Sequence, residues 1–115
     1  MLPKILRLNS VEIPTVARKG RLIQLPGLDV RILPHQDSTL PAQFAVSIST
    51  HISKKAVIRN RIKRKLHAAI INLNHQASFP PQRYLLIVRA DTLKDLSAEE
   101  IEHLLSALRG SKSAP

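Results

Sequence analysis

The stretch KKAVIRNRIKRKLHAAIINL, residues 54–73, decides how this chain folds. Apolar residues recur along it three or four positions apart, which is the spacing of one face of a helix. The resulting stripe consists of Ile62, Leu66, Ala69, Ile70 and Leu73. This spacing predicts an amphipathic helix over residues 55–73 that packs on the rest of the protein through a single face.

The first half of this predicted helix is strongly basic. Seven of the twelve residues from Lys54 to Lys65 are basic and none is acidic. The seven are Lys54, Lys55, Arg59, Arg61, Lys63, Arg64 and Lys65. Those on the helix flank the apolar stripe or lie behind it. Cations in the first turns oppose the helix dipole, which favours acids there, so their presence indicates a function rather than a gain in helix stability.

The net charge of the chain belongs to its first part. Residues 1–67 hold 13 basic and 3 acidic residues, which accounts for the whole net charge of +10, while residues 68–115 hold five of each. This asymmetry indicates an anionic partner. A solvated helix face is the plain alternative, but such faces usually mix charges of both signs. A membrane-surface helix would set Trp, Phe or Leu on a broad apolar face, so nucleic acid is the favoured partner.

Strands are predicted on both sides of the basic helix. Residues 28–33 alternate as a half-buried strand does, and Pro34 ends the pattern. Residues 44–49 alternate with large side chains on one face and small ones, including Ser47 and Ser49, on a face left open to a ligand. The apolar run from Tyr84 to Val88 predicts a central strand, and a further short strand is predicted near residues 18–24.

Two more helices complete the predicted fold. Asn9 and Ser10 are candidate caps for the first helix, which Pro14 makes short, kinked or begun at Pro14 itself. Ser97 and Glu100 form a capping box for the last helix. Its apolar stripe is Ile101, Leu104, Leu105 and Leu108, and Gly110 is the residue expected just beyond its end.

These elements predict an α+β fold, a small α/β sandwich in which helices pack on a mostly antiparallel sheet of about four strands. The length of 115 residues allows one domain, predicted over residues 1–110, with a disordered tail at 111–115. The first ten residues lack the apolar core of a signal peptide, and the longest strongly apolar run, residues 85–88, is far shorter than a membrane span. Together with the absence of cysteine, this favours a cytoplasmic protein without a membrane partner.

The residues of an active site are missing. The chain has no cysteine, its five histidines show no HxxxH or HExxH spacing, and no glycine-rich phosphate loop occurs. The acids between Asp91 and Glu102 are explained by helix capping. We therefore predict no catalytic residue, no metal ligand and no cofactor bound by the protein itself, and no obligatory protein partner is evident. His51, beside the basic run, is at most an RNA contact.

Zinc-finger spacing, a heptad zipper and the aromatic signature of RNA recognition motifs are also absent. With aromatic residues at only 3%, stacking of bases on aromatic rings is not the main mode of binding. The binding mode that remains is a basic helix, packed against a sheet, that contacts the nucleic-acid backbone.

The run Lys54-Lys55-Ala56-Val57-Ile58-Arg59-Asn60-Arg61-Ile62-Lys63-Arg64-Lys65-Leu66 resembles the protein component of bacterial ribonuclease P. The signature of that family is Ala-Val-x-Arg-Asn-Arg-x-(Lys/Arg)-Arg. Weaker agreements extend over nearly the whole chain: Leu2-Pro3-Lys4, Arg7-Leu8, Lys19-Gly20, Val46-Ser47, the strand before Arg89 and a leucine-rich last helix.

The resemblance implies a fold shared with a domain of a small-subunit ribosomal protein, with a left-handed crossover. It also implies a subunit of an endoribonuclease ribonucleoprotein in which the RNA is the catalyst, uses Mg²⁺ and removes the 5′ leader of precursor tRNA. Ribonuclease P RNA and precursor tRNA are the implied partners. The implied RNA-binding residues are Lys55, Arg59, Asn60, Arg61, Lys63 and Arg64, to which the charge run adds Lys54 and Lys65. The side chains suit this role because Arg binds phosphate bidentately and Asn can hydrogen-bond phosphate or a 2′-hydroxyl.

A cleft between the signature helix and the sheet holds the leader in the family. The residues expected to line it here are Ile13, Ala17, Arg31, Ser47 and Ser49. Ile13 and Ala17 stand where the family commonly carries aromatic residues. Thr50, His51 and Ile52 replace its usual Ser-Lys-Lys, and Lys54 replaces a usual glycine.

Two other functions stay open from the sequence. One is a ribosome-associated or general structural RNA-binding protein of similar fold, without a role in tRNA processing. The other is a protein-only nuclease, for which no acidic cluster that could hold a metal is visible.

Overall fold

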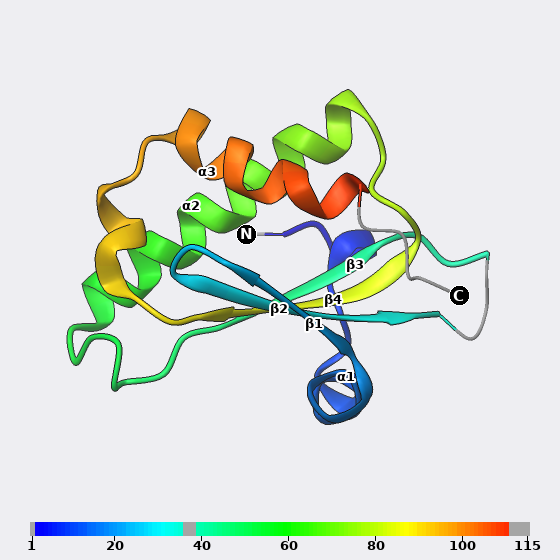
Figure 1. Cartoon of the computed structure of the whole chain (residues 1–115), viewed down its shortest axis with the longest axis horizontal. Coiled ribbons are helices and arrows are strands. Elements are labelled where there is room, and N and C mark those ends of the chain that lie inside the picture. The colour runs from blue at the N-terminus through cyan, green and yellow to red at the C-terminus, as the bar shows by residue number, and fades with distance from the viewer. Residues whose placement is uncertain (1, 36–38, 111–115) are drawn as a thin grey trace.

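A four-stranded sheet forms the middle layer of the computed structural model, which describes residues 2–35 and 39–110 (Figure 1). The strands are β1 (Arg21–Leu25), β2 (Leu28–Pro34), β3 (Gln43–Ser47) and β4 (Gln82–Val88), and their order in the sheet is β1-β2-β4-β3. β1, β2 and β4 pair antiparallel, whereas β3 runs parallel to β4. The predicted mostly antiparallel sheet and the central place of β4 are confirmed.

The hairpin between β1 and β2 turns at Pro26 and Gly27. Gly27 has a φ of 71°, in the left-handed region that glycine adopts without a steric penalty. The strand predicted near residues 18–24 starts and ends later in the chain than predicted. Arg18 and Lys19 belong to the preceding helix, and β1 begins at Arg21.

Helices cover the two faces of the sheet unequally. α2 (Ala56–Gln76) and α3 (Ala98–Ser106) lie on one face, and the short α1 (Ile13–Lys19) lies on the other (Figure 1). α2 connects β3 to β4, the parallel pair, and its predicted apolar stripe is buried at all five positions: Ile62, Leu66, Ala69, Ile70 and Leu73. The helix begins one residue after its predicted start and ends three residues beyond its predicted end.

The core between the sheet and α2 gathers all three aromatic residues of the chain. Phe44 and Tyr84 stack with ring centroids 4.7 Å apart, and Phe79 meets Phe44 edge-on at 5.0 Å. Burial raises the pKa of Tyr84, whose hydroxyl donates a hydrogen bond to the Pro80 carbonyl oxygen at 2.8 Å. Since all three rings are buried, the chain presents no aromatic surface on which a base could stack.

The N-terminal segment runs beside β3 and covers part of its edge. The Leu8 amide donates to the Phe44 carbonyl oxygen at 2.9 Å. The segment contains two 3₁₀ turns, η1 (Lys4–Leu6) and η2 (Ser10–Glu12), and Asn9 caps the second by accepting from the Val11 amide. Pro14 lies in the first turn of α1, where its missing amide costs nothing, so the predicted short helix begun near Pro14 is confirmed.

α1 is fixed at both ends. A Cβ on Gly20 would lie 2.5 Å from the Val16 carbonyl oxygen, so only glycine fits where the chain leaves α1 for β1. Arg83 of β4, only 8% exposed, donates to Glu12 Oε1 at 3.1 Å and to the Pro34 carbonyl oxygen at 2.8 Å. These contacts hold the start of α1 against the central strands.

Two further predicted boundaries are wrong, and one turn was not predicted. β3 ends at Ser47, so Ile48 and Ser49 lie beyond the strand. The capping box of Ser97 and Glu100 is present, but α3 ends at Ser106 and a 3₁₀ turn, η4 (Ala107–Gly110), follows, so Gly110 is not the residue after the helix. A further 3₁₀ turn, η3 (Asp91–Asp95), precedes α3 and was not predicted. The tail predicted at 111–115 lies outside the described residues.

Candidate nucleic-acid interface

The first half of α2 and its N-cap present a set of exposed cations. We call these residues the basic face: Lys54, Lys55, Arg61, Lys63 and Arg64. All are exposed, and no acid interrupts the sequence between residues 54 and 65. The first turn of α2 has no acidic residue, and Lys55 at the N-cap makes no side-chain cap. The helix thus brings like charges together at an end where its own dipole disfavours them, which an anionic partner would offset.

Arg59 has a different environment from these exposed cations. It is half-buried, and its Nη1 donates to the Ser53 carbonyl oxygen at 2.7 Å. This bond ties the loop before α2 to the first turn of the helix. Arg59 therefore positions the Lys54 and Lys55 end of the basic face, and only part of its guanidinium remains free for a phosphate.

Lys65, predicted to bind RNA, makes a structural contact. Its Nζ donates to the carbonyl oxygens of Lys94 and Leu96, at 2.5 and 2.7 Å. These carbonyls lie in η3 and just before the capping box of α3, so the side chain ties α2 to the segment that leads into α3. The structure accordingly places Lys65 outside the basic face.

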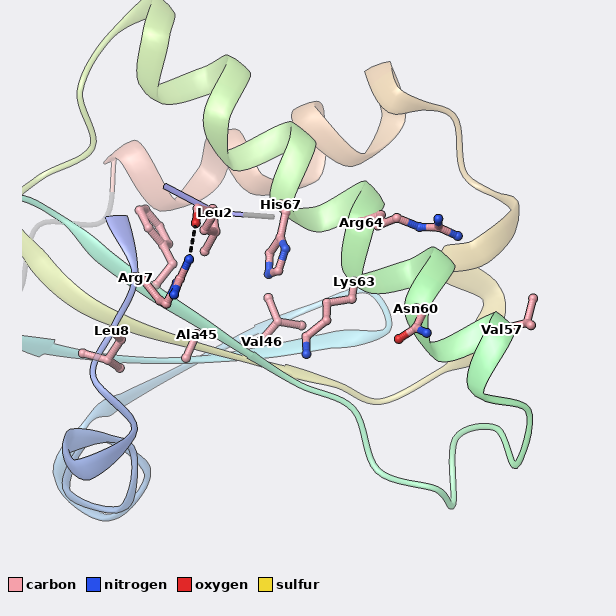
Figure 2. A pocket seen from close by; sticks show the side chains of 11 residues that line it. Leu2, Arg7, Leu8, Ala45, Val46, Val57, Asn60, Lys63, Arg64 and His67 are labelled. Atoms are coloured by element: carbon pink, nitrogen blue, oxygen red, sulfur yellow. Dashed lines mark hydrogen bonds between the residues drawn. The ribbon is translucent and has the colours of Figure 1, made fainter. Parts of the chain in front are cut away.

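A groove borders the basic face, between α2, β3 and the N-terminal segment (Figure 2). Its volume is about 670 Å³, and we call it the helix–strand groove. The lining residues are Leu2, Arg7, Leu8, Phe44, Ala45, Val46, Val57, Asn60, Lys63, Arg64 and His67. Every charged residue among them is cationic. A smaller hollow adjoins the groove, shares Val46, Asn60 and Lys63 with it, and adds Ser47, Ile48 and Arg59.

His67 is the one histidine of this groove. Its partial burial lowers its pKa to about 4, and the positive charges of Lys63 and Arg7 add to the effect. The imidazole is therefore neutral at pH 7 and offers one donor and one acceptor nitrogen. On the opposite side of the groove, the Arg7 guanidinium donates to the Leu2 carbonyl oxygen at 3.0 Å.

The five residues predicted to line a leader cleft do not share one surface. Ile13 packs with Leu8, Val16 and Leu85 beneath the sheet, on the side of α1, and Ala17 is exposed on the same short helix. Arg31 lies on β2, and its Nη1 donates to the Gly20 carbonyl oxygen at 3.1 Å. None of these three lines the helix–strand groove or the adjoining hollow.

The two serines lie nearer to the basic face. Ser47 is exposed at the end of β3 and lines the adjoining hollow together with Asn60 and Lys63. Ser49 lies in the loop beyond β3, where its hydroxyl accepts from the His51 amide at 3.2 Å. Of the five predicted residues, Ser47 alone lines a hollow between the signature helix and the sheet that the described residues form.

Sequence reasoning missed the residues that complete the groove, Arg7, Leu8 and His67. One signal was present. Asn60, Lys63, Arg64 and His67 are spaced i, i+3, i+4 and i+7, so they share a side of α2. For Arg7 and Leu8 no local signal exists, because their place depends on the pairing of the N-terminal segment with β3, more than thirty residues later.

The comparisons with known proteins agree with this architecture. The family model described as Ribonuclease P matches residues 2–111. The chain belongs to this family. A ribonuclease P protein component from Rippkaea orientalis is 37% identical over 112 residues, covering 94% of this chain and 84% of the relative. One from Synechococcus elongatus is 35% identical and covers 91% of both chains.

Solved structures of the family share the fold. The ribonuclease P protein of Thermotoga maritima superposes with a TM-score of 0.75 at 15% identity, covering 93% of this chain and 98% of that one. The Staphylococcus aureus protein gives a TM-score of 0.71 at 19% identity, covering 90% and 91%. The chain is thus a member of the ribonuclease P protein family with that family's α+β fold.

The described residues form neither a cluster of metal ligands nor a membrane-spanning helix. Within residues 2–35 and 39–110, no group of three or more His, Cys, Asp or Glu side chains is placed to hold a metal ion. In the same ranges, no helix has the length and apolar character needed to cross a membrane.

Proposed function

We propose that this chain is the RNA-binding protein subunit of ribonuclease P. It binds the catalytic RNA and the 5′ leader of precursor tRNA and assists RNA-catalysed, Mg²⁺-dependent 5′ maturation of tRNA. Membership of the ribonuclease P protein family supports the assignment of the chain to this enzyme. The observation that carries the RNA-binding role is the basic face, five exposed cations in the first half of α2 and the two residues before it, with no acid among residues 54–65.

The physical role of this face is to lower phosphate repulsion. Catalytic RNA and precursor tRNA are both polyanions, and their close approach concentrates negative charge. Arg61 and Arg64 can each bind phosphate oxygens with two parallel hydrogen bonds, while the Lys ammonium groups act as point charges. Bound cations displace condensed counterions, so assembly is favoured most at low salt.

The basic face does not itself fit Mg²⁺. That ion prefers oxygen ligands, especially carboxylates and phosphates, whereas this surface offers ammonium and guanidinium groups. The metal chemistry of the reaction is therefore assigned to the RNA, and this chain's residues bind and orient the RNA backbone.

The hollow beside β3 suits the leader next to the basic face. Ser47, Asn60 and Lys63 line it together, which combines a hydroxyl, an amide and a cation along an exposed strand end. Such groups contact the phosphates and sugars of a single strand without reading its sequence. Ile13, Ala17 and Arg31 lie on the α1 side of the sheet, so a leader that touches them as well passes around the end of β3.

The test is reconstitution of cleavage. A bacterial ribonuclease P RNA is incubated with precursor tRNA at a Mg²⁺ concentration too low for the RNA alone, with and without this protein. We expect the protein to restore cleavage at the correct 5′ position. Binding of the RNA without restored cleavage would point instead to a structural RNA-binding protein, and cleavage of precursor tRNA that persists without the ribonuclease P RNA would point to a protein-only nuclease.

A further inference from the structure

A second groove lies between the turn of the β1–β2 hairpin and the start of α3. We call it the acidic groove, and its volume is about 390 Å³. The residues that line it are Pro26, Leu96, Glu99, Glu100, His103 and Leu104. Leu96 and Leu104 are half-buried and supply apolar surface together with Pro26, whereas Glu99 and Glu100 are exposed. The acidic groove thus combines apolar surface with the sign of charge opposite to that of the basic face.

The basic face also carries an exposed apolar side chain. Val57, in the first turn of α2, is 66% exposed. It lies four residues before Arg61 and seven before Arg64, so the three side chains share one side of the helix. Phosphate groups satisfy the two arginines but leave the valine in water. A surface that offers apolar and anionic groups together satisfies all three side chains.

The two surfaces lie next to each other on the molecule. In Figure 1, the start of α2, the yellow-orange η3 turn and the turn of the β1–β2 hairpin lie at the same end. The Lys65 ammonium, one turn after Arg61, donates to the carbonyl oxygen of Leu96, which lines the acidic groove. Within residues 2–35 and 39–110, no ion pair joins the basic face to Glu99 or Glu100. The opposite charges are therefore adjacent without neutralising each other.

We propose that, in the absence of RNA, two copies of this chain form a two-fold dimer in which the basic face of each copy docks on the acidic groove of the other. In this dimer Val57 packs on Leu96 and Leu104, and Arg61 faces Glu99. Because the two surfaces lie at one end of the molecule, a two-fold axis brings both pairs together at once, and the assembly closes at two copies. The second copy is the occupant that the charge complementarity of these two surfaces favours.

The dimer has a consequence for RNA binding. It covers the basic face, so RNA and the second copy compete for the same cations. The dimer itself rests only on the two surfaces, whereas this competition also rests on the proposed function. The free subunit is consequently shielded from other polyanions, and its RNA partner displaces the second copy by mass action.

The direct test is sedimentation velocity of the full chain without RNA. We expect a dimer at about 50 mM salt, with a dissociation constant that rises at least about tenfold at about 500 mM salt, because screening weakens the contact between exposed charges. A protein that stays monomeric at about 100 µM in low salt would overturn the proposal. A dimer that is insensitive to salt would also overturn it, since its contact would not involve these charges.

A charge swap identifies the contact. Glu99→Arg and Arg61→Glu each place like charges in both contacts of a homodimer, so each variant alone should be monomeric. In an equimolar mixture, one contact of the heterodimer joins the two original side chains and the other joins the two introduced charges, so the dimer should return. A mixture of folded variants that stays monomeric would contradict the proposal. If either variant fails to unfold cooperatively on heating, the salt dependence of the unaltered chain decides alone.

Glu102→Arg is the control for this charge reversal. It makes the same change on the same helix, but Glu102 does not line the acidic groove and its carboxylate accepts from the Asn72 side-chain amide at 3.1 Å. This variant should dimerise like the unaltered protein. Loss of the dimer here as well would show that net charge, and not the groove, governs association.

The apolar part of the contact has its own test. Val57→Ser removes apolar surface at an exposed position and should weaken the dimer about tenfold. Ala68→Ser, at another exposed position of α2, should leave the dimer unchanged. Equal dimer affinity of the two variants would show that Val57 lies outside the interface and would contradict the proposed docking.

Competition with RNA separates this proposal from the proposed function. Energy transfer between donor-labelled and acceptor-labelled copies should fall as ribonuclease P RNA is added. RNA that binds while the energy transfer persists would show that the dimer leaves the basic face open, which overturns the proposal. If the RNA does not bind at all, the proposed function fails, and sedimentation still decides whether the dimer exists.

Discussion

Arg61 and Lys65 lie four residues apart on α2, yet their cations have different surroundings. Arg61 is exposed on the basic face, whereas the Lys65 ammonium donates to the carbonyl oxygens of Lys94 and Leu96. The charge run alone could not separate these two roles, because spacing predicts the side of the helix but not the partner that approaches it. At this scale, two cations one helical turn apart differ in their contacts: Lys65 ties α2 to the segment before α3, whereas Arg61 stays exposed.

Replacing Lys65 with methionine should therefore lower stability. The substitution keeps the apolar stem but leaves two carbonyl oxygens without their charged donor, which costs about 1–3 kcal/mol of unfolding free energy. Urea denaturation measures the change. Lys63→Met is the matched control at an exposed position and should stay within about 0.5 kcal/mol of the unaltered protein. Equal stability of the two variants would show that Lys65 does not anchor α3.

Substitutions of Arg61 and Arg59 should also differ in their effect on stability. Arg61→Ala removes an exposed cation, so it should weaken RNA binding about three- to tenfold with an unchanged thermal midpoint. Arg59→Ala also loses the hydrogen bond to the Ser53 carbonyl oxygen, so it should cost about 1 kcal/mol of stability besides weakening binding. Filter binding and thermal unfolding measure the two effects. A fall in stability for Arg61→Ala would mark that residue as structural.

His67 should make stability depend on pH. Its pKa in the folded protein, about 4, lies below its ordinary value of 6.5, so the unfolded chain binds more protons between these values. Stability is therefore lost as pH falls from about 6.5 toward 4, by about 1–2 kcal/mol because the ring stays partly in water. Denaturant titrations across this range measure the slope. His67→Leu should flatten it, and an unchanged slope in this variant would rule out His67 as its source.

At the scale of elements, the sequence predicted a helix or strand best where its local apolar pattern matches the face that the fold buries. The stripe of α2 is buried at all five predicted positions, and the continuous apolar run of β4 becomes the central strand. The ends of elements that are set by tertiary contacts were harder to predict from the sequence. β3 stops at Ser47 although the alternation continues to Ser49, and β1 starts late because Gly20 must pass close to Val16.

The capping box of α3 is a second case of a local pattern that holds. The Ser97 hydroxyl accepts from the Glu100 amide at 3.1 Å, and the Glu100 carboxylate accepts from the Ser97 amide at 3.0 Å. Hydrogen bonding to Ser97, chiefly to its backbone amide, also lowers the pKa of the Glu100 carboxylate. Ser97→Ala should cost about 1 kcal/mol of unfolding free energy, measured by urea denaturation. Ser78→Ala, at an exposed position outside any helix, is the control, and an equal effect at both sites would contradict the capping role.

At the scale of the whole molecule, the sheet separates two groups of residues that had been predicted to form one RNA-binding site. α1 and the predicted residues Ile13, Ala17 and Arg31 belong to one side, while the basic face belongs to α2 on the other (Figure 1). The charge imbalance and the signature were readable from the sequence, so the basic helix and the family were predicted. The helix–strand groove was not, because three segments remote in sequence meet there.

The most direct test of the RNA-binding role of the basic face is the salt dependence of binding to ribonuclease P RNA. Five exposed cations predict that log K falls with log salt with a slope of about −3.5 to −4.5. The double variant Arg61→Ala, Arg64→Ala should reduce this slope by about 1.4 to 1.8. Arg18→Ala, Lys19→Ala removes two exposed charges at α1 and should leave it unchanged. A slope near −1 for the unaltered protein, or an equal reduction in both double variants, would contradict the account.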